Sequence, residues 1–270
     1  MSRILSSIDG RKVGTDSEKR LISSGGFRAG DHGKQIDLAA PNRVVFLDDF
    51  LGDIIADQWN AVEGTDAATS DAAILAGGIG GVLRLTTGDA GTGIAADMEQ
   101  LTQALQWQAS NGGLSIQARF KLSAITTCYA FFGFTDLVTF EAPIESAGAA
   151  DTITTNASDA VGFMFDTRMA TDNWWLVGVA GDTDATAQNA GSAPVADTYA
   201  TYRVDIDSAG KASFYINGVQ VGIVMTGAVT AATDLTPTIA VSKTSVAASM
   251  TMDVDYVHVS MERAADGGAV

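Results

Sequence analysis

The segment Thr198–Val224, TYATYRVDIDSAGKASFYINGVQVGIV, decides the fold of this chain. Every second residue from Tyr202 to Ile206 is apolar, which is the period of a half-buried strand. A second strand follows a polar turn. Asn217-Gly218 then predicts a tight type I′ hairpin, because both central residues of that turn need a positive φ. Three antiparallel strands cannot stand alone in water, so the segment predicts a second layer against its apolar face.

Similar strands run through the rest of the chain. Leu114–Leu122 (LSIQARFKL) alternates without a break, while Cys128–Phe134 and Trp174–Ala180 are almost wholly apolar, as expected for strands covered on both faces. Roughly a dozen short strands and almost no helix predict an all-β fold, a two-sheet antiparallel jelly-roll sandwich.

Composition divides the chain into three expected parts. Residues 1–43 are rich in glycine, and their apolar residues come in ones and twos, so they predict an extended, irregular N-terminal arm. Residues 44–262 form the jelly-roll domain, and residues 263–270 form a flexible C-terminal tail.

The charge of the chain is unevenly distributed. The formal net charge is −16, yet residues 1–44 hold eight Lys or Arg against five Asp or Glu. An acidic body argues against non-specific binding of nucleic acid or an anionic membrane. The basic arm predicts an anchor on an acidic partner surface, and a solvated tail is the alternative. The candidate anchoring residues are Arg11, Lys12, Lys19, Arg20 and Arg28.

Processing signals are sparse. Cys128 is the only cysteine, so no intramolecular disulfide forms and no oxidising compartment is implied. No apolar run is long enough for a transmembrane helix. The N-terminus lacks the apolar core of a secretory signal. We therefore expect synthesis in the cytoplasm, with release only by a route such as cell lysis.

Acidic residues supply two candidate carboxylate pairs. Asp205 and Asp207 are predicted to share one strand face, as are Asp253 and Asp255. A general acid/base pair would need apolar surroundings and a substrate groove, so a solvated outer face is the favoured interpretation. The sequence has no His/Cys pattern for a transition metal, no phosphate loop, no dinucleotide fingerprint and no catalytic-serine elbow. It predicts no catalytic residue.

Two other features allow ligand binding. The Asp-rich loops 166–172 and 182–184 offer oxygen ligands for Ca²⁺, although they lack EF-hand spacing, so calcium is an alternative to having no cofactor. Trp174 and Trp175 are adjacent in a strand and point to opposite faces. One is expected in the core and the other on the surface, as a platform for a sugar ring or as a contact between sheets or subunits.

The body, residues 44–262, resembles the concanavalin A-like lectin/glucanase superfamily, the laminin-G-like jelly rolls. The resemblance rests on DDF, LSIQARFKL, AVGFMFDT, WWLVGVAG, the YRVDID-SAGKASFYINGVQVG meander and VDYVHV. Hydrolases of the superfamily carry a Glu-x-Asp-x-x-Glu strand just after the strand that resembles LSIQARFKL. The corresponding stretch here is CYAFFGFTD, which lacks that triad, so the resemblance implies a protein that is not an enzyme.

The signal-less, acidic, Ala/Gly/Thr-rich chain with a basic arm also looks like a virion protein of a tailed bacteriophage. This resemblance implies a capsid decoration protein or a head or tail fibre component, located in the virion. The implied partners are major capsid or tail subunits and further copies of the chain, for example in a trimer. A lectin module that binds cell-surface glycan is the alternative, and a divergent glycoside hydrolase is the second.

Overall fold

The computed structural model describes residues 42–66, 70–78, 80–89, 93–148, 151–245 and 248–263. The chain divides into two compact units, and the unit described below begins at Arg43. All but the last two residues of the predicted arm lie outside the described residues, and so does the predicted tail after Arg263. The five candidate anchoring residues therefore have no structural description here: Arg11, Lys12, Lys19, Arg20 and Arg28.

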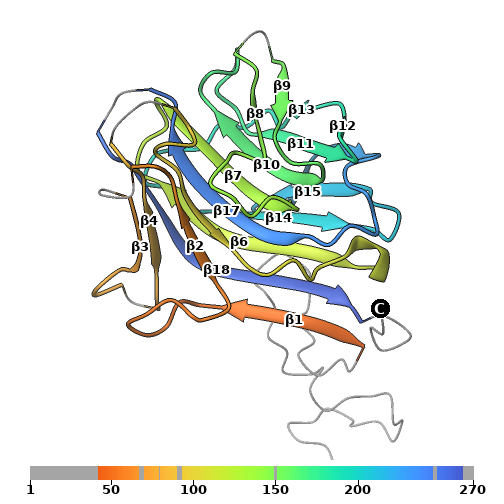
Figure 1. Ribbon diagram of the computed structural model, residues 1–270, viewed down its shortest axis with the longest axis horizontal. Helices are drawn as coiled ribbons and strands as arrows, with labels where there is room; N and C mark the ends of the chain where they lie inside the picture. Colours follow the sequence, from red (N-terminus) through yellow and green to blue (C-terminus); the bar gives the residue numbers. More distant parts are fainter. Residues whose placement is uncertain are drawn as a thin grey trace, which may run out of the picture. The chain divides into compact units, whose positions relative to one another are not determined.

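Two antiparallel sheets of eight strands each make up the body (Figure 1). In the first sheet, seven strands form a continuous path and β1 pairs with β18 beside it. In path order the strands are β16 (Val219–Met225), β15 (Ala212–Ile216), β14 (Ala200–Ile206), β6 (Leu114–Leu122), β18 (Thr251–Glu262), β4 (Leu83–Thr86) and β3 (Asp71–Ile74), with β1 at Arg43–Asp48.

The second sheet is arranged in the same way. Seven strands form a continuous path, and β13 pairs with β11 outside that path. Its strands are β12 (Thr183–Asp184), β11 (Trp175–Ala180), β10 (Ala160–Asp166), β7 (Cys128–Thr135), β17 (Thr236–Lys243), β5 (Glu99–Thr102) and β2 (Asn60–Glu63), with β13 at Gln188–Asn189. Strands β8 (Ile144–Ser146) and β9 (Ile153–Thr155) form a separate hairpin.

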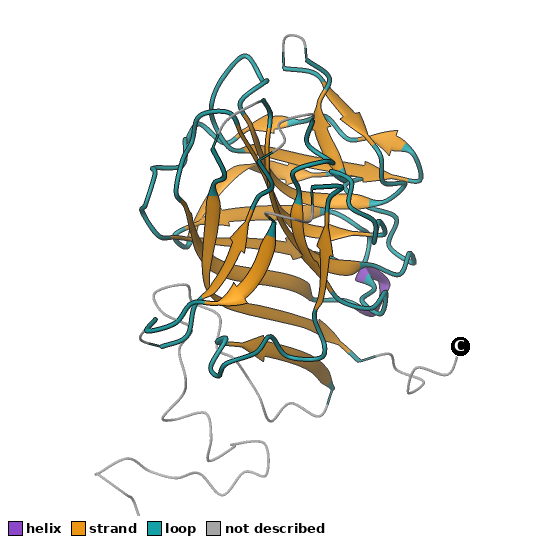
Figure 2. Cartoon of the chain, turned by 60° about the vertical axis from the view of Figure 1, so that its left-hand side comes forward, coloured by secondary structure: helices purple, strands orange, loops and turns teal. Residues whose placement is uncertain are grey.

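Strands and loops account for nearly all of the described chain (Figure 2). The helical element η2 is a single 3₁₀ turn at Ala109–Asn111. No helix in the described ranges is long and apolar enough to cross a membrane. The predicted all-β, two-sheet antiparallel sandwich is confirmed.

The predicted meander forms strands β14, β15 and β16. Asn217 and Gly218 have φ values of 49° and 81°, as a type I′ turn requires. The register of β15 against β16 shifts between Ala212 and Phe214, so the second half of β16 bulges away from its partner.

The main core lies between the sheets and is rich in aromatic side chains. The Phe120 and Tyr202 rings of the first sheet stack with their centroids 4.4 Å apart. In the main core, Trp174 meets Phe120 of the first sheet and Phe163 of the second sheet edge-on, both at 6.0 Å. The Trp174 indole N–H donates to the Tyr202 hydroxyl at 3.1 Å, so the buried polar atom of the indole has a partner.

A bulge changes the phase of β18. Val254 pairs with Phe120 and Tyr256 pairs with Arg119, so Asp255 is an extra residue between them. Val254 and Val257 therefore both face the core, although they are three residues apart. The sequence MDVDYVHV shows the same change of phase. Its core residues Met252 and Val254 are two positions apart, and the next one, Val257, follows after three.

Candidate functional site

The outer face of the second sheet is apolar and covered. We call it the roofed face, and it is formed by Tyr129, Phe131, Met164, Trp175 and Val177. Ala142 and Ile144 from the loop that carries β8 pack on it, together with Ile94, Met98 and Met169 from two other loops. These loops close a second hydrophobic core on the side of the sheet away from the first core.

Strand β7 is the stretch that, by the resemblance given above, corresponds to the strand with the Glu-x-Asp-x-x-Glu triad in hydrolases of the superfamily. Its outward residues are Tyr129, Phe131, Gly133 and Thr135, and none of their side chains is a carboxylate. All eight residues of β7 are buried. Cys128 faces the inner core, where burial raises the pKa of its thiol. Strand β7 therefore has neither the acids nor the open groove that glycoside hydrolysis requires.

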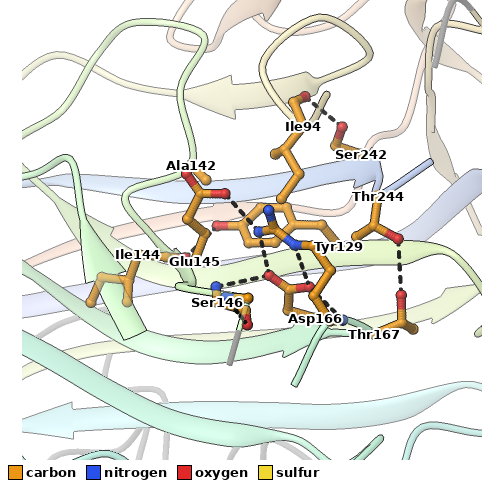
Figure 3. A network of polar contacts seen from close by, with 12 residues as sticks. Ile94, Tyr129, Ala142, Ile144, Glu145, Ser146, Asp166, Thr167, Ser242 and Thr244 are labelled. Atoms are coloured by element: carbon orange, nitrogen blue, oxygen red, sulfur yellow. Dashed lines mark hydrogen bonds and ion pairs between the residues drawn. The ribbon is translucent and has the colours of Figure 1, made fainter. Parts of the chain in front are cut away.

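Three charged side chains fasten the roof to the sheet, and we call them the roof lock: Glu145, Asp166 and Arg168. The Arg168 guanidinium donates to both oxygens of Asp166, from Nη2 at 2.7 Å and from Nε at 3.1 Å. It also donates from Nη2 to Glu145 Oε2 at 2.6 Å. Asp166 ends β10 and Glu145 lies in β8, so the lock joins the sheet to the roof (Figure 3).

The lock satisfies a fully buried carboxylate. The side chain of Asp166 is 0% exposed, and it also accepts the Ser146 backbone N–H at 2.9 Å. Desolvation alone would lower the pKa of Arg168, but the hydrogen bonds to Asp166 and Glu145 outweigh it and raise that pKa. A charged pair in this setting is structural, since its hydrogen-bonding capacity is used within the protein.

Neutral hydrogen bonds hold the same loops. The Tyr129 hydroxyl donates to the Ile144 carbonyl at 2.9 Å, and burial raises the pKa of that hydroxyl. The Ser242 hydroxyl donates to the Ile94 carbonyl at 2.6 Å. Figure 3 shows these contacts on both sides of the roof lock. The roof is thus bonded to the sheet at several separate points.

The expectation that one of the two tryptophans lies at the surface is wrong. Trp174 and Trp175 do point to opposite faces, but Trp174 is 1% exposed in the main core and Trp175 is 5% exposed under the roof. The Trp175 indole N–H donates to the Thr171 carbonyl at 3.3 Å. An indole that stacks on a sugar needs one free ring face, and neither ring has one.

The Asp-rich loops are engaged by protein groups. Asp166 is held by Arg168, and Asp184 accepts a hydrogen bond from the Thr155 hydroxyl at 3.2 Å. Within the described ranges, no group of three or more His, Cys, Asp or Glu side chains is arranged to hold a metal ion.

The outer face of the first sheet is polar and open, and we call it the open face. Its cations pair with aspartates: Arg84 with Asp253 at 2.7 Å, Arg119 with Asp255 at 2.7 Å, and Arg203 with Asp205 at 3.3 Å. Arg119 and Arg203 also stack over the rings of Tyr199 and Tyr215, at 4.3 and 4.0 Å from the ring centroids. The charges on this face are largely neutralised by one another.

The predicted carboxylate pairs take separate roles on this face. Asp253 and Asp255 bind different cations because the bulge separates them. Asp207 lies beyond the end of β14, where it accepts the N–H groups of Ala209 and Lys211 at 2.9 Å. Strand β14 ends at Ile206, so Asp207 belongs to the turn, and Asp205 and Asp207 both line a groove at the end of this face.

A groove of about 620 Å³ lies at one end of the open face. Its wall combines the Gly112–Gly113 backbone, the Asp205 and Glu262 carboxylates and the side chains of Lys211 and Val224. The groove is an open concavity that could accept a ligand. Its lining is mixed polar and apolar and contains no tryptophan.

A buried carboxyl that is not bound to an arginine lies between the sheets. Glu99 in β5 is fully buried, and no hydrogen-bond partner reaches either of its oxygens. It faces Glu63 across the β2–β5 pair. Desolvation, with smaller contributions from Glu63 and Asp71, raises the pKa of Glu99 to about 8.

Comparisons with known proteins agree with this architecture. No family model and no curated protein matches the sequence. A β-glucanase of Bacillus licheniformis matches with a TM-score of 0.54 and 13% identity, over 80% of this chain and 97% of that chain. The carbohydrate recognition domain of Emp47p matches with a TM-score of 0.54 and 10% identity, over 81% and 94%.

The fold is that of the concanavalin A-like jelly rolls. A protein of unknown function from Shewanella oneidensis MR-1 has it too, with a TM-score of 0.54 and 13% identity over 86% of this chain and 91% of that chain. At these identities the likeness shows the fold alone, and the activity of this protein has to be argued from its own residues.

Sequence reasoning missed the roof lock and the buried Glu99. The signal for the lock was Asp166-x-Arg168 at the end of an apolar strand, next to a long loop that contains Glu145. Nothing in EQLT marks Glu99 as buried, because strand β5 is covered on both faces only in the assembled sandwich.

Proposed function

We propose that this protein is a non-enzymatic structural component of a tailed-phage virion, either a capsid decoration protein or part of a head or tail fibre. Its concanavalin A-like domain would be displayed on the particle, and its basic N-terminal segment would anchor it. The roofed face carries the non-enzymatic part of this proposal, because apolar loops fill the surface above β7.

Glycoside hydrolysis generally needs two carboxyl groups on either side of the scissile bond. Two carboxylates at the roofed face, Asp166 and Glu145, are both bound to Arg168. The paired aspartates of the open face bind arginines in the same way. Such groups support a rigid scaffold, since a general acid needs a raised pKa and access to substrate.

The anchoring part of the proposal rests on charge. After residue 42 the chain holds nine Lys or Arg against 27 Asp or Glu, whereas basic residues predominate before it. An acidic displayed domain stays soluble, and a basic leading segment is attracted to an acidic partner. Assembly through such a segment leaves the folded domain free at the particle surface.

Particle incorporation tests this function. The full chain should co-sediment with phage particles in a density gradient. A variant with Arg11, Lys12, Lys19, Arg20 and Arg28 changed to Glu should stay in the soluble fraction with an unchanged melting temperature. A control with Arg11, Arg20 and Arg28 changed to Lys keeps the charge and should co-sediment. Equal incorporation of the Glu variant, or absence of the full chain from particles, would overturn the proposal.

Carbohydrate binding is the second candidate, and the groove on the open face favours it. Its peptide backbone, carboxylates and one valine provide the mixture of polar and apolar contacts that a sugar uses. Ser213 also lines the groove. Binding to a glycan array that is lost in Ser213→Arg, which places a large side chain in the groove, would support this candidate. Release of reducing ends from β-glucan would instead support the glycoside hydrolase.

A further inference from the structure

Two Asn-Gly pairs occur in the described part of the chain, Asn111-Gly112 and Asn217-Gly218. In such a pair the backbone nitrogen of the glycine can attack the side-chain carbonyl carbon of the asparagine within the same segment. Glycine has no Cβ to obstruct that approach, and the two reacting atoms are held close together by the chain itself. The two pairs have the same chemistry, so their surroundings decide which asparagine reacts.

The attacking nitrogen of the first pair is engaged. Asn111 ends the 3₁₀ turn η2, and the Gly112 N–H donates to the Ala109 carbonyl at 2.8 Å. Asn111 and Gly112 are both half-buried at the wall of the groove. The Gly112 nitrogen must lose its proton in order to attack, so this hydrogen bond has to break first, and the reaction is slowed.

The attacking nitrogen of the second pair is open. Asn217 and Gly218 are the central residues of the β15–β16 turn, and both are exposed. The strand pairing on either side of this turn begins with Ile216 and Val219. Among the described residues, the Gly218 N–H has no hydrogen-bond partner. A base in the solvent can therefore remove its proton.

The carbonyl group that would be attacked is polarised. Asn217 Oδ1 accepts the Thr201 N–H at 2.9 Å. The Asn217 N–H donates to the Thr201 carbonyl at 2.7 Å, which fixes the turn to the start of β14. A donor on Oδ1 stabilises the negative charge that develops on this oxygen when the carbon is attacked, as an oxyanion hole does.

We propose that Asn217 is a site of spontaneous deamidation in the folded protein and that the fold protects Asn111. The Gly218 nitrogen bonds to Cγ of Asn217, the Cγ–Nδ2 bond breaks, and Nδ2 leaves as ammonia with the proton from Gly218. Water then opens the succinimide: hydrolysis at Cγ gives aspartate, and hydrolysis at the backbone carbonyl carbon gives isoaspartate. The inference is independent of the virion proposal.

The two products affect the hairpin differently. An aspartate keeps an oxygen that accepts the Thr201 N–H, so the turn should persist. An isoaspartate carries the main chain through Cβ and lengthens a tight turn by one carbon, so the pairing of β15 with β16 should weaken. Either product also places a negative charge on the hairpin, residues 212–225, which otherwise contains no charged residue.

Peptide mapping by mass spectrometry tests the proposal. The full chain is incubated in mildly alkaline buffer, once folded and once in urea, and the mass change from amide to acid is followed at both asparagines. For each asparagine, the rate in the folded chain is divided by the rate in urea. This ratio should be larger for Asn217 than for Asn111 by about tenfold or more, because only the Asn111 site has to break a backbone hydrogen bond. A smaller difference, or no reaction at Asn217 in the folded chain, would overturn the proposal.

Asn217→Asp is the matched control variant. It has the side chain of one product from the start, so its turn peptide should show no change from amide to acid, while Asn111 behaves as in the wild type. Its melting temperature should stay close to that of the wild type. The isoaspartate form, separated by ion exchange and identified with isoaspartyl methyltransferase, should melt at a lower temperature. An isoaspartate form as stable as Asn217→Asp would overturn the expected effect on the hairpin.

Discussion

The outer faces of the two sheets differ in polarity, and each is stabilised in a different way. The roofed face is apolar, so loops must cover it, and the roof lock ties those loops down with a buried Asp166. The open face is polar and needs no cover, because its arginines pair with aspartates and stack on tyrosines. The difference teaches that ion pairs of similar length have different roles depending on burial.

Burial sets the expected energies. Removing one partner of a buried pair leaves an uncompensated charge and costs about 3–5 kcal/mol. Removing one partner of an exposed pair costs about 0–1 kcal/mol, because water solvates the residue that is left. The Arg168–Asp166 and Arg119–Asp255 contacts are both 2.7 Å long, so the two faces offer a matched comparison.

The largest effect is expected from Arg168→Ala. It leaves Asp166 buried without its cation and loosens the roof, so the free energy of unfolding should fall by about 3–5 kcal/mol. Urea denaturation measures the loss, and increased binding of a hydrophobic dye would report exposure of the roofed face. A loss below about 1 kcal/mol would show that the roof does not depend on the lock.

Glu99→Gln tests the buried carboxyl of Glu99, which lies between the two sheets without a hydrogen-bond partner. Folding raises the pKa of Glu99 from 4.5 to about 8, so the folded state holds a proton that the unfolded state releases. Wild-type stability should therefore fall as the pH rises from 4.5 to about 8, and then level off. The variant should lose this slope and gain about 4 kcal/mol at pH 8.

Urea titrations at several pH values measure this dependence. Glu63→Gln is the control: it keeps Glu99 ionisable and removes one neighbouring charge, so the slope should remain but end at a lower pH. Identical pH profiles for the wild type and Glu99→Gln would contradict the assignment.

Gly218→Val tests whether the first sheet depends on its backbone register. Gly218 has a φ of 81°, which a β-branched residue adopts only with strain, so we expect a loss of about 1–3 kcal/mol. Thermal unfolding measures it, and the neighbouring Val219→Thr serves as a control without backbone strain. A change that leaves the melting temperature untouched would show that the hairpin tolerates another turn.

The smallest effect is expected from Arg119→Ala on the open face. The free energy of unfolding should change by less than about 1 kcal/mol, and by less still in high salt. Combined with Arg168→Ala in the same urea titrations, this variant compares the two faces directly. Equal losses at both sites would mean that burial does not distinguish them.

Much of the fold could be predicted because it is local. Tyr202–Ile206 alternates in steps of two and Asn217-Gly218 requires a type I′ turn, and both patterns are readable along a single segment. The Trp175 prediction failed because alternation along a strand does not show whether loops cover its outer face. The alternation did not show that β14 ends at Ile206, just before Asp207, because strand ends depend on where pairing stops.

The sequence by itself determined the all-β class, the two-layer sandwich and the meander, since alternation and turn chemistry depend on neighbouring residues. Only the tertiary structure decided which outer face is closed and which is open. That choice depends on long-range contacts, such as Glu145 with Arg168 and Arg84 with Asp253. The same residue types make solvated pairs or a buried lock, and burial emerges only when distant segments pack together.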